Sequence, residues 1–368
     1  MKRYRKILTV ILLLSCTLLL TGLERILTNQ LTTQQLASRW SEETEFAQIS
    51  CFFTDEADFT ASQVVPLEAV LKESLDEASV NADNKTGRTW VDAYSTQGEL
   101  IVASKRSSGT FRAFGVSEDF FLFHPLKLLS GSYLTADDLN EDSVILDENV
   151  AWQLFGSSDV AGLTVQIGGR AYVIKGVVRS DSGYFSKAAE EENATIYVSY
   201  EVMKENLETE DNELTIDCYE LLIANPVEDF GMTTLEEALE MEETDYEMVE
   251  NSTRYGLKNK ITMLKSFGTR SMGMKGIVYP YWENRAKGYE DVILLLFVVE
   301  ILCLIYPLIL LVKKLHWCWK NKKKAGDFLK ECLIAFYKWA VPAVKKIPGY
   351  IKRVNKLRKG TKNDADAL

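Results

Sequence analysis

The chain has 368 residues, of which 46% are hydrophobic and 26% are charged, a balance that excludes intrinsically disordered and collagen-like proteins. The formal charge of −11 is divided into blocks: residues 1–23 carry four bases and no acid, residues 24–290 carry 47 acids against 22 bases, and residues 313–368 carry 16 bases against four acids. A soluble enzyme rarely separates its charges in this way, so the pattern indicates a membrane protein.

Two apolar segments lie at the borders of these charge blocks. The first, 7–23, contains no charge and would form a helix of about 25 Å, while the second, 291–312, gives about 31 Å from Val292 onward. Bases flank the first segment at 1–6 and follow the second at 313–368. Since such flanks stay on the cytoplasmic side, we predict a two-pass plasma-membrane protein with both termini cytoplasmic and residues 24–290 extracytoplasmic. The alternatives for 7–23 are a cleaved signal peptide and a lipoprotein signal ending at Cys16.

The second apolar segment carries one charge near its middle, Glu300. A carboxylate there costs about 2.5–3.5 kcal/mol on insertion scales. Two interpretations remain open: contact with a polar group on a partner helix or in a transport path, and a protonated side chain tolerated in a very apolar helix. The aromatic residues Tyr279, Tyr281, Trp282 and Tyr289 precede this segment and predict an aromatic belt at the outer membrane face.

The extracytoplasmic block, 46–290, alternates predicted strands and helices, which indicates an α+β domain. Residues 24–45 lack Pro and Gly and predict a stalk helix that continues the first membrane segment. We predict strands at 46–53, 90–93, 100–104, 144–146, 195–200 and 217–224, with a turn near Gln97, and helices at 66–78, 148–155, 234–243 and 253–266. Gly156 would end its helix in a left-handed C-cap, and residues 165–178 predict a hairpin with a Gly168-Gly169 turn.

The ordered set of motifs between residues 120 and 179 resembles the MacB-like periplasmic core domain of ABC transporter permeases. The matching residues are Gly131, Leu134, Thr135, Asp138, Val144, Leu146, Ala151, Leu154, Phe155, Gly156, Gly162, Tyr172, Val173, Gly176 and Val177. Ser132 stands where that family commonly has Arg. Together with the two apolar segments, the resemblance extends over about residues 1–315.

The resemblance implies a transport role, with one departure. Such permeases typically have three membrane helices after the outer domain, whereas one apolar segment follows it here. We therefore expect a non-catalytic accessory or degenerate permease subunit whose partners are an ABC ATPase and a multispan permease subunit, and whose outer domain moves with ATP-driven changes at the cytoplasmic side. The alternative is an anchored extracytoplasmic sensor or binding module for a peptide or an envelope component.

The sequence shows no catalytic set and predicts no cofactor or metal. Its two histidines, His124 and His316, fall on opposite sides of the predicted membrane, and no Walker A motif occurs. We expect His124 in an aromatic core segment. Cys51 and Cys218 are the two extracytoplasmic cysteines, and either a disulfide between them or two buried free thiols is compatible with their predicted strands.

Charge also predicts partners for the remaining segments. The acid-rich stretches 190–192, 201–220 and 236–250 are typical of solvated faces, with a cation or basic-peptide site as the alternative, and they disfavour nucleic acid. In the basic tail, 313–368, residues 328–341 predict an interfacial amphipathic helix that binds anionic lipid. Docking of that helix on a partner protein is the alternative.

Overall fold

A computed structural model of the chain describes residues 2–41, 45–80, 86–135, 142–180, 194–209, 213–269 and 276–320. The chain forms two compact units, Met1–Leu18 with Glu300–Leu368, and Leu19–Val299. Helices α1 (Lys2–Asn29) and α10 (Tyr281–Lys320) each contribute to both units. Within them, Tyr4–Asn29 and Tyr281–Trp317 are long and apolar enough to cross a membrane, so the described residues contain two candidate transmembrane helices.

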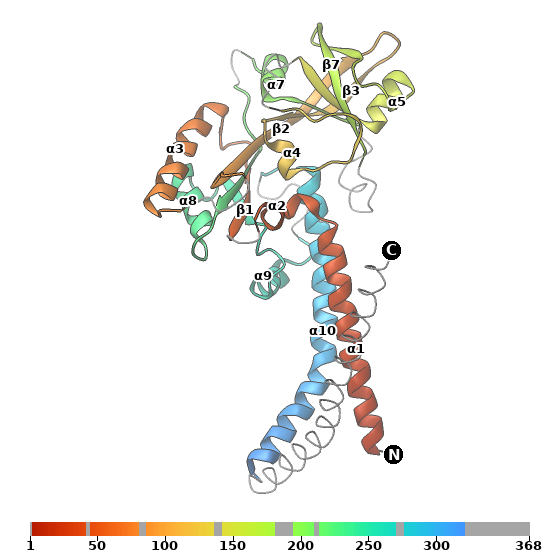
Figure 1. The fold of residues 1–368 in the computed structure, drawn as a ribbon, viewed down its shortest axis with the longest axis vertical. Helices are drawn as coiled ribbons and strands as arrows, with labels where there is room; N and C mark the ends of the chain where they lie inside the picture. Colours follow the sequence, from red (N-terminus) through yellow and green to blue (C-terminus); the bar gives the residue numbers. More distant parts are fainter. Residues whose placement is uncertain are drawn as a thin grey trace, which may run out of the picture. The chain divides into compact units, whose positions relative to one another are not determined.

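The second unit is built on a mixed ten-stranded sheet, counted over the described ranges (Figure 1). Its order is β10-β1-β9-β2-β3-β8-β5-β7-β4, and β6 pairs with β2 and β7. The pairs β3–β8 and β5–β7 are parallel and the other pairs are antiparallel. The strands are β1 (Phe46–Phe53), β2 (Trp90–Ala103), β3 (Ser108–Val116), β4 (Leu128–Gly131), β5 (Ser143–Asp147), β6 (Thr164–Ile167), β7 (Arg170–Val178), β8 (Thr195–Ser199), β9 (Cys218–Ala224) and β10 (Tyr246–Glu250).

Short helices connect the strands, and two groups of them cover the sheet. They are η1 (Thr32–Gln34), α2 (Leu36–Trp40), α3 (Ala61–Glu77), α4 (Phe120–Phe123), α5 (Glu148–Phe155), α7 (Tyr200–Leu207), α8 (Phe230–Leu239), α9 (Leu257–Met263) and η2 (Leu264–Ser266). Helices α3 and α8 lie together beside β1, and α5 lies at the other end of the sheet near β7 (Figure 1). Each group encloses its own hydrophobic core. The predicted mixed domain of helices and strands is confirmed.

Strand β1 is buried on both faces, which positions the site described below. Ile49 and Cys51 point into the core beneath α3 and α8, whereas Phe52 points to the opposite face, against Tyr279. Because side chains alternate along a strand, Gln48 and Ser50 also belong to the second face, and both are buried. Polar side chains in a doubly buried strand require hydrogen-bond partners.

Several predicted elements have different bounds in the structure. The continuous stalk helix over 24–45 is wrong, because α1 ends at Asn29 and a 3₁₀ turn and α2 follow. The predicted turn near Gln97 is also wrong: β2 continues through it, paired along this stretch with β3. Strand β10 lies inside the acid-rich stretch 236–250, which is therefore not only a solvated face. Helix α3 begins at Ala61, five residues before Pro66, because a capping box forms at its start.

The central motif region agrees with prediction. Helix α5 ends at Gly156, whose φ of 73° is the left-handed cap, and Gly168-Gly169 connects β6 and β7 as a hairpin. Asp138 and the predicted interfacial helix 328–341 lie outside the described residues.

Candidate functional site

The first turns of α10 carry a stripe of buried charges. Glu283, Lys287 and Glu290 are spaced by four and three residues, so they lie on one helix face, and they are 2%, 5% and 2% exposed. Charged groups are almost never buried to this extent unless they are paired. The neighbouring element must therefore supply countercharges.

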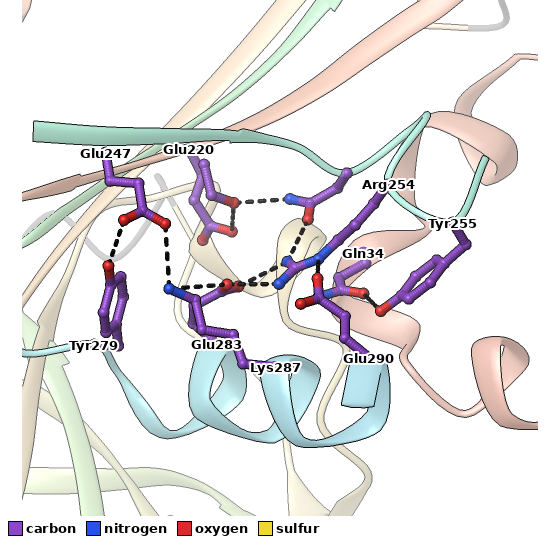
Figure 2. A network of polar contacts seen from close by, with 11 residues as sticks. Gln34, Glu220, Glu247, Arg254, Tyr255, Tyr279, Glu283, Lys287 and Glu290 are labelled. Atoms are coloured by element: carbon purple, nitrogen blue, oxygen red, sulfur yellow. Dashed lines mark hydrogen bonds and ion pairs between the residues drawn. The ribbon is translucent and has the colours of Figure 1, made fainter. Parts of the chain in front are cut away.

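Arg254, in the turn after β10, supplies the principal countercharge (Figure 2). Its two terminal nitrogens donate to the two oxygens of Glu283 at 2.6 and 2.8 Å, and its Nε donates to Glu290. Nη1 also donates to Asn251 Oδ1 at 3.0 Å. The guanidinium, 2% exposed, thus makes a two-pronged contact with one carboxylate and a single contact with a second.

The electrostatics of this cluster favour the ionised arginine. Burial alone would lower the pKa of Arg254, but the carboxylates of Glu283 and Glu290 hold that pKa well above its ordinary value. Lys287 adds a second cation: its Nζ contacts Glu247 of β10 at 3.2 Å and lies 3.3 Å from the centre of the Tyr279 ring. The Tyr279 hydroxyl donates to Glu247 at 2.7 Å, so Glu247 is contacted by both Lys287 and Tyr279.

The network continues into the sheet through hydrogen bonds. Asn251 Nδ2 donates to Ser50 Oγ at 2.9 Å, and Ser50 Oγ donates to Glu220 at 3.3 Å. Glu220, in β9, also contacts Nε2 of His124. The His124 ring stacks on Phe120 with ring centres 4.2 Å apart, so its expected place in an aromatic core is confirmed. Polar contacts therefore run without a break from α10 through the β10 turn and β1 to β9.

A second set of contacts joins the same region to the end of α1. The Tyr255 hydroxyl donates to Gln34 of η1 at 2.5 Å, and Lys260 Nζ contacts Glu24 at 2.5 Å. Gln48 of β1 donates to the backbone oxygen of Thr33 at 2.6 Å. The end of α1 and the η1 turn are therefore connected to β1 and to the segment that follows β10.

This arrangement pairs each buried charge of α10 with an opposite charge. Within the parts of the chain that the structure describes, no three His, Cys, Asp or Glu side chains are grouped to hold a metal ion. A helix that is attached to a sheet through desolvated ion pairs cannot shift relative to it without separating those pairs. These pairs therefore hold the first turns of α10 against β10 and the turn that follows it.

The family-motif residues lie apart from this network. Ala151, Leu154, Tyr172 and Val177 are buried in the core around α5, with Phe155 packed against it. Gly131 and Gly176 face each other across β4 and β7, where an added Cβ on Gly131 would lie 2.0 Å from the carbonyl oxygen of Lys175. Gly162 has a φ of 85° and donates its amide to Ile174 at 2.7 Å. These positions support the domain's core.

Thr135 and the remaining predicted site residues have separate locations. Thr135 lines a cavity of about 730 Å³ together with Glu68, Trp90, Asp92 and Tyr200. Burial raises the pKa of Asp92 to about 6, although a hydrogen bond from Tyr219 opposes that shift. This polar cavity is a second candidate site.

Of the two alternatives for Cys51 and Cys218, the structure has the two buried free thiols and not the disulfide. Cys51 pairs in register with Tyr219, and Cys218 pairs with Phe52, so the two thiols point to opposite faces of the sheet. The aromatic belt is wrong for Tyr279, Tyr281 and Trp282, which are at most 6% exposed and fill the core beside Phe114 and Phe52.

Glu300 lies half-buried in α10, and its two interpretations, contact with a polar group on a partner helix or in a transport path and a tolerated protonated side chain, stay predictions. The hydroxyl of Tyr289, the fourth residue of the predicted aromatic belt, donates a hydrogen bond to Gln30 Oε1 at 3.2 Å.

Sequence reasoning did not find the ionic network, although two signals for it exist. The spacing of Glu283, Lys287 and Glu290 marks a charged helical face directly before an apolar segment. Glu220 interrupts the otherwise apolar strand 218–224, which indicates a buried acid that needs a partner. Arg254 has no such local signal.

The fold and site define a class: a mixed α/β domain of extracytoplasmic type between two candidate membrane helices. The chain matches the MacB-like periplasmic core domain over residues 9–237. It therefore belongs to that family, whose members are permease components of ABC transporters.

Individual relatives match part of the chain. The macrolide export ATP-binding/permease proteins MacB of Neisseria gonorrhoeae and Neisseria meningitidis are 28% identical over 117 residues, which cover 31% of this chain and 18% of each relative. The aligned stretch is thus less than a fifth of the length of these relatives. Among solved structures, the periplasmic region of MacB from Actinobacillus actinomycetemcomitans is 18% identical, covers 58% of this chain and 92% of that chain, and has a TM-score of 0.41. The extracellular domain of the noncanonic ABC-type transporter YknZ from Gram-positive bacteria is 16% identical, with 55% and 100% coverage and a TM-score of 0.37.

Proposed function

We propose that this protein is a membrane-anchored, non-catalytic accessory or degenerate permease subunit of an ABC transport system. Family membership supports the transport role, and the candidate membrane helices on both sides of the domain support the anchoring. In this proposal both termini are cytoplasmic and residues 24–290 are extracytoplasmic. A partner ATPase hydrolyses ATP, and a multispan permease subunit completes the membrane part.

The observation that carries a coupling role is the buried contact of Arg254 with Glu283 and Glu290. Leaving buried charges without their partner costs about 3–5 kcal/mol. A displacement of α10 that kept the sheet in place would incur such a cost, so helix and sheet move together. The proposed work of the domain is therefore to transmit movement from the membrane to the extracytoplasmic side.

Co-purification of the full-length protein from its native membrane tests the partner assignment. We expect an ABC ATPase and a multispan permease subunit to accompany it in mild detergent. A stable monomer without either partner contradicts the proposal. Phosphatase fusions test the orientation independently: a fusion after residue 290 is expected to be active, and a fusion after residue 320 to be inactive.

A second candidate function is an anchored sensor or binding module for a peptide or an envelope component. The cavity lined by Glu68, Asp92 and Trp90 favours it, because acids beside an aromatic wall suit a cationic ligand. Ligand-dependent stabilisation of the full chain in the absence of any ATPase would support this function. The predicted binding of anionic lipid by residues 313–368 is a separate proposal, tested by salt-sensitive binding of the tail peptide to anionic vesicles.

A further inference from the structure

The segment formed by α9 and η2 exposes an apolar face that the domain core does not use. Leu257, Ile261 and Leu264 are spaced by four and three residues, so they share one side of the segment, and Phe267 follows. They are 65%, 54%, 36% and 43% exposed, and none of the residues of α9 is buried. Large apolar side chains exposed together on one side of a segment are typical of a surface that meets a membrane or another protein.

The same segment differs in charge from the domain around it. Residues 257–269 contain Lys258, Lys260 and Lys265 and no acid, within a block where acids outnumber bases by more than two to one. Lys258 lies 3.6 Å from Glu228 in a contact exposed to solvent, and Lys265 is exposed. Apolar residues interleaved with lysines are typical of helices that lie in a membrane interface.

The contacts of this segment place it at the outer end of the candidate membrane helices. Lys260 contacts Glu24, the first charge after the apolar segment of α1, and lies 5.4 Å from the centre of the Phe297 ring in α10. The amide of Gly268 donates to Asp291 at 3.4 Å. Phe297 is six residues beyond Asp291, or about 9 Å along the helix. An interfacial helix is immersed to about 5–10 Å, which matches this interval.

We propose that α9 and η2 form an interfacial anchor that inserts Leu257, Ile261, Leu264 and Phe267 into the outer leaflet, with the exposed Lys258 and Lys265 at anionic headgroups. The inference goes beyond the transport role and rests on the proposed membrane topology. The lipid is the occupant because the segment contacts Glu24 of α1 and Asp291 and Phe297 of α10, at the outer ends of the candidate membrane helices, and because its exposed charge is positive. The anchor would hold the edge of the sheet formed by β10 at the membrane surface, beside the ionic network.

Photo-crosslinking of the full-length protein in nanodiscs tests this anchor. A benzophenone amino acid replaces Ile261 in one variant, Leu295 of α10 in a second, and Val65 of α3 in a third; the last two are 56% and 69% exposed. In discs of phosphatidylglycerol and phosphatidylcholine, we expect lipid adducts at 261 and 295 at a yield several-fold above that at 65. Discs of phosphatidylcholine alone should reduce the adduct at 261 and leave that at 295 unchanged.

The three positions separate failure of the anchor from failure of the topology. Adducts at 295 without adducts at 261 overturn the anchor and leave the membrane helix intact. A cross-linked dimer through 261 in place of lipid adducts also overturns it, because the occupant would then be a second copy. Absence of lipid adducts at 295 overturns the membrane-spanning assignment on which the inference rests.

Discussion

Replacing Arg254 with Met is expected to be the most damaging single change in the ionic network. The substitution keeps much of the side-chain volume and removes the charge that faces Glu283 and Glu290. Both carboxylates are 2% exposed, so water cannot replace the lost partner without opening the site. Removal of one member of a buried ion pair costs about 3–5 kcal/mol of unfolding free energy. For a domain of this size each kcal/mol corresponds to roughly 2–4 °C, so the midpoint should fall by roughly 6–20 °C.

Thermal unfolding of the detergent-solubilised protein, followed by tryptophan fluorescence, measures this loss. Arg170 provides the matched control, since it also contacts two acids, Asp142 and Glu205, but is 54% exposed. Arg170→Met should leave the midpoint unchanged. The triple variant Arg254→Met, Glu283→Gln, Glu290→Gln should regain most of the loss, because no buried charge is left unpaired. A midpoint for Arg254→Met that equals that of Arg170→Met would refute the reasoning.

Three further predictions follow from other parts of the domain. Burial raises the pKa of Asp217 to about 7, despite a 2.6 Å hydrogen bond from the amide of Gln97. The folded state therefore holds this proton more tightly than the unfolded state, and ionisation of Asp217 lowers stability as pH rises from about 4 to 7. Asp217→Asn should be more stable than the wild type at pH 8, by up to about 4 kcal/mol in urea unfolding, and equal to it near pH 4. Gly131→Ala should lower the free energy of unfolding by about 1–3 kcal/mol, because Gly131 has a φ of 76° and no room for a Cβ. Thermal unfolding measures this loss. Cys51 and Cys218 should resist alkylation at pH 8 in the folded protein, since burial raises the pKa of each thiol well above its ordinary value, and both should react in denaturant without reductant.

Each of these predictions has a contradicting result. Equal stability of Asp217→Asn and wild type at pH 8 would mean that the carboxyl ionises freely in the folded state. An unchanged midpoint for Gly131→Ala would show that β4 and β7 can separate at little cost, and Val70→Ala, an exposed change on α3, provides the control. Thiols that appear in denaturant only after reduction would establish the disulfide that the strand register excludes.

Local signals were sufficient to predict the centre of the domain. Helix α5, its Gly156 cap and the β6–β7 hairpin depend on neighbouring residues, namely an apolar helical face, a glycine stop and a two-glycine turn. The same kind of reasoning misplaced the turn near Gln97. A glycine within an alternating pattern predicts a turn locally, but pairing of β2 with β3 and β9 on its two edges favours a continuous strand.

The ionic network depends on contacts that local patterns do not encode. Arg254 meets Glu283 and Glu290 across 29 and 36 positions, and Ser50 meets Asn251 across 201. The sequence predicts that Tyr279, Tyr281 and Trp282 lie at the membrane surface because they directly precede an apolar segment. Composition alone does not show that α10 begins inside the domain core. Trp282 packs instead against Phe114, which makes the first turns of α10 part of the domain.

Native-state hydrogen exchange of the wild-type protein in nanodiscs tests most directly whether α10 and the sheet behave as one body. If the buried charges join them, the amides of residues 283–290 and those of β9 should exchange with the same free energy of opening, since neither opens alone. Arg254→Met should lower the free energy of opening of the amides of residues 283–290 below that of the amides of β9. Exchange in the wild type that is already faster at 283–290 than in β9 would contradict a rigid connection between membrane helix and sheet.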